Sequence, residues 1–441
     1  MSRKAYPTYK PSGVEWSGEI PEHWPIVRLR FSAKINPSRS ELNGVPEIQQ
    51  ASFIPMEAVH EYGGLSLDQT RPLSEVGTGY TYFREGDVLT AKITPCFENG
   101  KGSIAKGLYN GLGFGTTELH VLRPYSDLDR SFLFYVTISD AFRKLGASYM
   151  YGAGGQKRVP DDFVKDFRQP MPPPVEQQAI ASLLDRETAR IDSLIEKKKR
   201  QIELLQEKRS ALISHAVTKG LDPNVKMKDS GVEWLGEIPE HWEVKSIRRI
   251  AKAVKTGGTP AGAEEMHFDQ TGFNWYTPSD FHVDVTLSGS SRRLSEIGKK
   301  EVRLFPAMTV MMVGIGATIG KVALSLEPSS CNQQINAIVC NSKMTPKFLT
   351  YLLRIMRAYI FRCGKFTTLP IINQEDTKAL IITCPPLPEQ DVIVSILDNE
   401  TERTDALIGK IQMSIDKLRE YRTALISAAV TGKIDVRKEV S

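Results

Sequence analysis

The residues best suited to binding chemistry lie in two series of polar loops, one in each half of the chain. Both series mix amides, hydroxyls and single basic side chains with small residues that let another backbone approach closely. Gln or Asn can bond an adenine edge in two places, Arg or Lys can reach guanine, and Thr or backbone amides can hold phosphate. The predicted DNA-contacting residues are Lys92, Thr94, Lys101, Thr116, Thr117, Gln156, Lys157 and Arg158 in the first half, and Thr259, Thr318, Lys321, Asn332, Gln333, Gln334, Thr367 and Thr368 in the second.

The two series occur in the same order along the chain, although their sequences differ. A loop after an apolar run comes first, near residues 92–95 and 314–318. A Thr-rich or amide-rich loop follows, and a basic loop comes last, near residues 154–158 and 365–370. Any one of these residues could belong to an ordinary surface turn, but recurrence in order favours a shared binding function for the set.

Motifs for catalysis or cofactor binding are incomplete in this sequence. Residues 314–320 resemble a dinucleotide fingerprint, but the third glycine comes one place too late. Gly320-Lys321-Val322 lacks the hydroxyl residue and the upstream glycine of a P-loop, and the histidines have no metal-ligand spacing. No carboxylate pair or activated nucleophile stands out. We therefore predict a protein that recognises a ligand, has no catalytic or metal-binding residues and binds no cofactor itself.

Much of the sequence is present twice. Residues 12–24 return as residues 230–242 with only Ser17 and Leu235 differing, and residues 176–218 align with residues 389–431 without a gap. Between these shared segments the two halves have little in common. A duplicated frame that carries two different inserts suggests a protein that recognises two different things.

The second repeated segment predicts two long helices with a heptad pattern. Prolines precede each helix, where they cost no backbone hydrogen bond, and Gly220 and Gly432 mark the ends. Each helix of about 43 residues would be roughly 65 Å long. The seam residues are Leu184, Ile191, Ile195, Lys198, Ile202, Leu205 and Leu212 in the first helix, and Leu397, Thr404, Ile408, Ile411, Ile415, Leu418 and Leu425 in the second.

Neither helix can bury its apolar stripe alone, so we predict that the two copies pair. A pseudo-twofold relation between the halves would make this pair antiparallel and place the inserted domains at opposite ends of a spacer. Two alternatives stay open, namely that each helix packs on its own globular half or pairs with another chain. The charges at residues 197–200 are expected to face solvent or a partner.

The order of the repeats predicts how the junctions are built. One copy of the short segment follows the first helix, whereas the other lies at the N-terminus, before any helix. Equivalent halves therefore require the N-terminal copy to lie against the end of the second helix, with the termini close together. Trp16, Trp24, Trp234 and Trp242 are interpreted as anchors of these junctions.

The expected fold is α+β, with two inserted domains of mixed α/β character separated by two long antiparallel helices that form a coiled-coil spacer. Short apolar runs broken by Gly, Asn, Asp and Pro predict the mixed domains. The predicted boundaries are residues 1–172 for the first domain, 173–220 for the first helix, 221–384 for the second domain, and 385–441 for the second helix and tail.

Composition agrees with an ordinary soluble protein of more than one domain. The chain has 441 residues, a net charge of +5 and five scattered cysteines without metal or disulfide spacing. The N-terminus lacks an apolar signal core, and no stretch approaches the roughly 20 apolar residues of a membrane span. We expect a reduced, cytoplasmic protein, for which modest basicity permits nucleic-acid binding without requiring it.

Three segments resemble the specificity subunit of type I restriction-modification systems. They are the repeated Ser-Gly-Val-Glu-Trp segment, the Pro-Pro-Leu-Pro-Glu-Gln start of the second helix and the Ala-Leu-Ile-Ser-Ala-Ala-Val-Thr-Gly-Lys segment at its end. The resemblance covers essentially the whole chain. It implies a DNA-binding subunit without an active site, which reads two short half-sites separated by unspecified base pairs.

The resemblance also implies partners. These are double-stranded DNA, two methyltransferase subunits that bind S-adenosylmethionine and, where present, two translocase-nuclease subunits that use ATP and Mg²⁺. Because the two inserts differ, the target should be asymmetric. The runner-up function is a DNA-recognition adaptor for a methyltransferase without a nuclease subunit, and a third is a coiled-coil interaction protein without DNA function.

Overall fold

The structure is a computed structural model that describes residues 5–153, 155–282, 284–366 and 369–437, and it divides into two compact units. The first unit combines the described residues up to Lys198 with those from Gln412 onward, and the second contains Lys199–Ile411. Each unit therefore holds one inserted domain and one half of each long helix.

The long helices are α5 (Pro174–Lys219) and α11 (Leu387–Val430). Proline at or before the first turn fits a helix start, because the first N–H groups have no partner within the helix. Gly220 and Gly432 have φ values of +78° and +71°, a left-handed conformation that commonly follows the end of a helix. The predicted helices and their glycine ends are thus confirmed.

In both units α5 and α11 lie against each other. In the first unit Arg422 of α11 donates to Asp192 of α5 at 2.6 Å, and in the second Arg209 of α5 pairs with Asp405 of α11. The N-terminal half of α5 thus meets the C-terminal half of α11, and the reverse holds in the second unit. The predicted intramolecular, antiparallel pair is confirmed. The predicted seam residues are all buried or half-buried, among mostly exposed neighbours.

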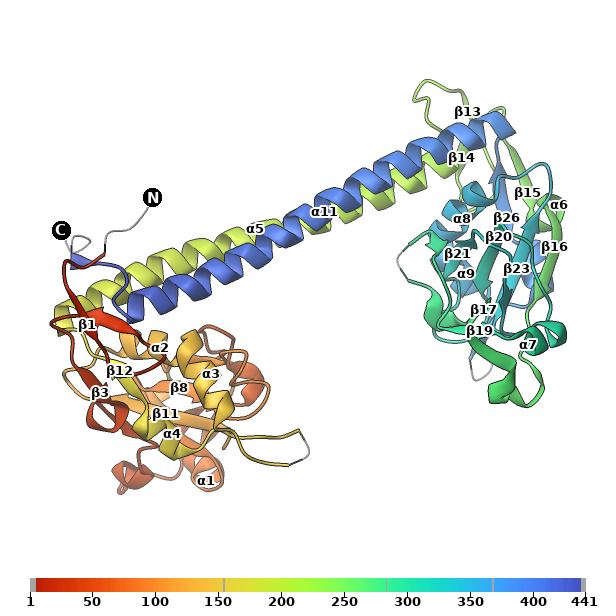
Figure 1. Cartoon of the computed structure of the whole chain (residues 1–441). Coiled ribbons are helices and arrows are strands. Elements are labelled where there is room, and N and C mark those ends of the chain that lie inside the picture. The colour runs from red at the N-terminus through yellow and green to blue at the C-terminus, as the bar shows by residue number, and fades with distance from the viewer. Residues whose placement is uncertain (1–4, 154, 283, 367–368, 438–441) are drawn as a thin grey trace. The chain divides into compact units, whose positions relative to one another are not determined.

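The first unit contains two four-stranded sheets, with the helices of the inserted domain beside them (Figure 1). One sheet has the order β4 (Ala33–Ile35), β11 (Leu119–Pro124), β8 (Val88–Ala91), β9 (Gly102–Ile104), and the other β6 (Thr70–Pro72), β5 (Gln50–Ile54), β10 (Leu112–Gly115), β7 (Thr81–Arg84). The helices are α1 (Leu73–Val76), α2 (Arg130–Ile138), α3 (Asp140–Ser148) and α4 (Asp161–Asp166), and the strand pairs are β1 (Tyr9–Pro11) with β2 (Glu19–Pro21) and β3 (Ile26–Arg28) with β12 (Arg168–Pro170).

The second unit has the corresponding sheets. Their orders are β16 (Ala251–Thr256), β23 (Ile335–Cys340), β20 (Thr309–Val313), β21 (Val322–Ser325), β18 (Thr286–Leu287), and β19 (Arg292–Leu294), β17 (Phe268–Tyr276), β22 (Ser330–Cys331). The helices are α6 (Ile247–Ile250), α7 (Glu296–Glu301), α8 (Pro346–Ile355), α9 (Arg357–Cys363) and α10 (Gln374–Ala379). The strand pairs are β13 (Met227–Asp229) with β14 (Glu237–Pro239), β15 (Glu243–Ser246) with β26 (Ile381–Cys384), and β24 (Lys365–Phe366) with β25 (Pro370–Ile371).

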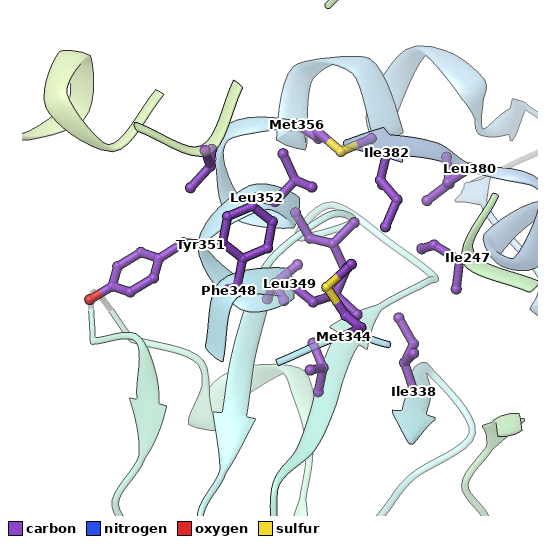
Figure 2. Close-up of a cluster of buried hydrophobic side chains, with 14 of the residues drawn as sticks. Ile247, Ile338, Met344, Phe348, Leu349, Tyr351, Leu352, Met356, Leu380 and Ile382 are labelled. Atoms are coloured by element: carbon purple, nitrogen blue, oxygen red, sulfur yellow. The ribbon is translucent and has the colours of Figure 1, made fainter. Parts of the chain in front are cut away.

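The core of the second unit lies between α8 and the sheet that contains β20 and β23. Figure 2 shows Phe348, Leu349 and Leu352 of α8 directed into this cluster, together with Ile338 of β23. The cluster also includes Val217 of α5 and Leu397 of α11. Burial of these side chains attaches the inserted domain to the helices, since removal of apolar surface from water is the main stabilising contribution.

The inserted domains share the central part of their topology despite their divergent sequences. In each domain the central strand (β11 or β23) pairs antiparallel with two neighbours, and in the second sheet one pair is parallel (β5 with β10, β17 with β22). The duplication therefore includes the domains as well as the frame. The two domains differ in the number of strands, with sheets of four and four strands in the first unit and of five and three in the second.

The repeated tryptophans anchor the junctions, as predicted. Trp24 Nε1 donates to Glu176 of α5 at 3.1 Å, and Trp242 Nε1 donates to Glu389 of α11 at 3.0 Å. Both indoles are fully buried. Trp16 stacks on Phe167 with ring centroids 5.2 Å apart, and Trp234 lies 5.5 Å from Tyr359.

The N-terminal junction segment lies against the end of α11, which confirms the prediction from chain order. Tyr9 Oη donates to the carbonyl of Gly432 at 3.0 Å, and a side chain at Gly432 would clash with Pro21 and Trp24. Arg437 lies 5.0 Å from the ring of Tyr6, so the described residues near the two termini are close together. Separately, no helix among the described residues is long and apolar enough to span a membrane.

Candidate nucleic-acid interface

Three polar loops of the first unit form one surface, at the ends of β8 and β10. The Lys92 amide donates to the Glu118 carbonyl at 2.9 Å. Thr94 donates to the Lys157 carbonyl from both N and Oγ1 at 3.0 Å, and the Lys157 amide donates back to Thr94 Oγ1 at 2.9 Å. Figure 1 shows the loop between α3 and α4, which includes Lys157, projecting from the rest of this unit. The structure thus brings together loops that are 63 residues apart in sequence.

Arg158 is held by a two-pronged ion pair with Glu118. Its Nε and Nη2 atoms donate to the two carboxylate oxygens at 2.8 and 2.6 Å. Hydrogen bonding from Arg158 lowers the pKa of Glu118, so the carboxylate stays charged at neutral pH. The geometry supports a positioning role for Arg158, whereas the neighbouring side chains of Gln156 and Lys157 are exposed.

The other predicted residues of the first unit differ in whether their side chains make hydrogen bonds within the protein. Thr116 Oγ1 accepts a hydrogen bond from the Glu118 amide at 3.2 Å, and Lys101 Nζ donates to the Met56 carbonyl at 3.2 Å. The Thr117 side chain is exposed. Direct contact of all these residues with DNA stays a prediction.

The second unit gathers its predicted residues in the corresponding place. Thr259 donates to Gln333 at 2.6 Å, and Asn332 donates to Gln334 at 3.0 Å. The Gly314 amide donates to the Gln334 carbonyl at 2.7 Å, and the Gly316 amide donates to the Pro370 carbonyl at 3.1 Å. The loops after β20 and β22 and the β24–β25 hairpin therefore adjoin. The backbone carbonyl of Thr318 accepts from the Lys321 amide at 3.1 Å, and Lys321 Nζ donates to the Phe281 carbonyl at 3.0 Å. Thr367 and Thr368 lie outside the described residues.

Equivalent positions of the two surfaces carry different chemistry. In the first unit, isolated antiparallel bridges align Ile93, Arg158 and Tyr151 in a row. In the second, the equivalent bridges align Ile315, Ile371 and Lys365. Side chains of paired residues project from the same face of a sheet. The two units thus present a tyrosine and a lysine at one matched position. Tyr151 is 68% exposed.

Sequence reasoning missed Tyr151 because a single aromatic residue before a glycine-rich loop has no periodic pattern. The only available signal was that loop itself, which begins at Gly152. Its cross-strand partner, Arg158, identifies its place on the surface. Aromatic rings on such surfaces can stack on nucleic-acid bases.

A buried polar residue supports the basic loop in each unit. His120 of β11 hydrogen-bonds through Nε2 to the Val159 carbonyl at 3.0 Å. Asn336 of β23 donates to the equivalent carbonyl, that of Ile372, at 2.9 Å. His120 is fully buried, and Asn336 nearly so. The same structural task is therefore performed by a titratable group in the first unit and by a neutral amide in the second.

This difference predicts that acid destabilises the first unit through His120. Burial lowers the pKa of His120 in the folded chain, so the unfolded chain binds the additional proton as the pH falls. Stability should drop below the unfolded pKa of about 6.5, by up to about 1.4 kcal/mol per pH unit. Urea unfolding of the wild type and of His120→Asn between pH 7.5 and 5.5 would measure this loss of stability. Equal pH dependence in both proteins would contradict the prediction.

Within the described residues, no cluster of three or more His, Cys, Asp or Glu side chains could hold a metal ion. The polar surfaces described above can offer hydrogen bonds and positive charge. The geometry supports recognition of a ligand.

The described chain thus consists of two mixed domains, and each domain has a polar loop surface and packs on part of an antiparallel helix pair. The model of the type I restriction modification DNA specificity domain matches residues 68–204 and 239–417, more than half of the chain. The chain belongs to this family.

Several curated relatives are specificity subunits of type I restriction enzymes. The EcoEI subunit of Escherichia coli is 39% identical over 186 residues, which are 42% of this chain and 31% of the relative. The EcoAI subunit of the same species is 42% identical over 180 residues, which are 40% of this chain and 30% of the relative. The match thus spans about a third of these two relatives. The putative MjaX subunit of Methanocaldococcus jannaschii is 22% identical, over 95% of this chain and 96% of the relative.

Solved structures show the same fold. A chain from a study of the type I restriction-modification system's assembly and conformational transition matches with a TM-score of 0.75 and 16% identity, over 94% of this chain and 99% of that one. The HsdS subunit from Thermoanaerobacter tengcongensis matches with a TM-score of 0.56 and 16% identity, over 94% and 98% of the two chains. The predicted α+β fold with two domains and a helical spacer is confirmed.

Proposed function

We propose that this chain is the DNA-recognition subunit of a type I restriction-modification complex. The observation that carries the proposal is the repeated surface: three loops meet at equivalent strand ends in both units but present different side chains. Each surface would read one half of a bipartite site. Because the surfaces differ, as at Tyr151 and Lys365, the two half-sites would differ in sequence.

The paired helices would act as a ruler between the half-sites. Half-sites on one face of B-DNA lie about 34 Å apart. A 46-residue helix such as α5 is roughly 69 Å long, which is sufficient to hold two readers at that separation. Gln and Asn side chains would supply base contacts, while Lys, Thr and backbone amides would hold the phosphates.

The proposed partners are double-stranded DNA, two methyltransferase subunits and, in a complete complex, two translocase-nuclease subunits. The chain itself would be non-catalytic and cytoplasmic. S-adenosylmethionine, ATP and Mg²⁺ would be bound by its partners. Exposed apolar side chains on the helices, including Leu194 of α5 and its repeat equivalent Leu407 of α11, suit docking of methyltransferase helices.

Mapping methylated adenines in cells that express this chain with its methyltransferase subunit tests the proposal. The expected pattern is one asymmetric, bipartite motif with a constant spacer. Binding of the purified complex to that motif should weaken steeply with salt, because Lys and Arg contacts release counterions. Methylation without a bipartite motif, or binding that is insensitive to salt, would contradict the proposal. A copurifying nuclease subunit would separate the complete complex from the alternative, an adaptor that serves a methyltransferase alone.

Modular reading predicts that a change in one unit affects one half-site. Gln156→Ala should relax recognition of one half-site and Gln333→Ala that of the other, each by about 1–3 kcal/mol if the amide bonds a base edge. Methylome sequencing with substituted half-sites measures this. Gln206→Ala, on the exposed surface of α5, serves as the control. Equal loss at both half-sites would contradict modular reading.

A further inference from the structure

A basic cavity lies beside the loop that follows β20 in the second unit. Its volume is about 470 Å³, and its lining includes Lys321, Arg354 and Arg357 together with His282. No carboxylate is among the described residues of the lining. Three side chains that are positive at neutral pH therefore face one space, an arrangement suited to an anion.

The basic groups are held in place by the fold. Lys321 Nζ donates to the Phe281 carbonyl at 3.0 Å, and Arg354 donates to the carbonyl of Val322 at 3.4 Å. Gly320, at φ +77°, lets the side chain of Arg357 pack against it, since a Cβ there would lie 3.1 Å from Arg357 Cγ. Arg357 begins α9 and is exposed, so its guanidinium can reach a ligand at the mouth of the cavity.

The cavity adjoins the predicted DNA surface. Lys321 directly follows the loop that begins after β20, and that loop bonds to the Pro370 carbonyl of the β24–β25 hairpin. Tyr135 and Tyr351 make equivalent bonds to Asp185 and Asp398, which places the apolar Ile138 of the first unit at the position of Arg354.

We propose that this cavity binds one phosphate group of the DNA backbone next to the second half-site, with Arg357 and Lys321 as its ligands. The inference rests on the proposed DNA-recognition function and adds a specific phosphate contact to it. Arg and Lys are the side chains that most often contact phosphate, and such a contact fixes the register of the reader on the duplex.

The test uses the complex of the full chain with its methyltransferase subunits and a duplex that carries the mapped target. Neutral methylphosphonates replace the backbone phosphates one at a time around the second half-site. One position should weaken wild-type binding by roughly tenfold and leave binding by Arg357→Ala unchanged. The slope of log affinity against log salt should also fall by about one in Arg357→Ala.

Arg362→Ala is the matched control, because Arg362 is exposed on the same helix and outside the cavity lining. It should keep both the wild-type slope and the sensitivity to the methylphosphonate. The inference is overturned if no position couples to Arg357, or if Arg362→Ala behaves the same way. Stoichiometric binding of inorganic phosphate by the DNA-free complex, with no methylphosphonate position coupled to Arg357, would indicate a site for a free anion and would also overturn it. If the wild type itself fails to bind the duplex, the proposed function fails instead.

Discussion

Insertion of one heptad into each long helix should abolish methylation at the original sites. Seven residues added between Lys198 and Lys199 and between Ile411 and Gln412 preserve the apolar seam, because the seam repeats every seven residues. They lengthen each rod by about 10 Å. The proposed readers would then be separated by the length of about three additional base pairs, and no longer meet both half-sites.

Methylome sequencing of the insertion variant measures this result. Any sites that remain should contain the same two half-sites with a longer spacer. A variant with two exposed substitutions on the helices and no added length is the control, and it should methylate the original sites. Unchanged methylation by the lengthened chain would show that the helices do not set the spacing.

Replacement of Trp242 by alanine should lower the free energy of unfolding of the second unit by about 3–5 kcal/mol. The indole is fully buried, lies against Gly220 and donates to Glu389 at 3.0 Å. Its removal leaves a cavity where α5 ends and deprives a carboxylate of a donor. Trp24→Ala should have the same effect on the first unit, since Trp24 makes the equivalent bond to Glu176.

Denaturant unfolding monitored by circular dichroism and calorimetry would measure these losses. Trp234→Ala is the control for the second unit, because Trp234 is only half-buried and should cost less. Trp242→Phe separates the cavity from the hydrogen bond, and it should retain most of the stability. Equal losses for Trp234→Ala and Trp242→Ala would show that the junction does not depend on the buried indole.

The two long helices and the repeated junction segments were predictable because their sequence patterns are local or occur twice. The heptad pattern of α5 and α11 appears directly in the order of residues. The gapless repeat implied equivalent halves, and chain order then required the N-terminal segment to meet the end of α11, as the bond from Tyr9 to Gly432 shows. No long-range contact had to be known for these conclusions.

The two polar loop surfaces were only partly predictable. Their loops could be identified by residue type, but Arg158 meets Glu118 from 40 residues away, and this pairing determines whether its guanidinium is available. The match between Tyr151 and Lys365 likewise requires the strand register, because the sequences around them do not align.

By itself, the amino-acid sequence determined that two similar halves carry paired long helices and different inserted domains. Periodicity and duplication can be recognised directly in the order of residues. Only the tertiary structure decided which polar atoms bond to one another and which stay exposed. It alone assembled Lys321, Arg354 and Arg357 around one cavity. The physical reason is that hydrogen bonding and charge act through space over a few ångströms, whatever the separation of the residues along the chain.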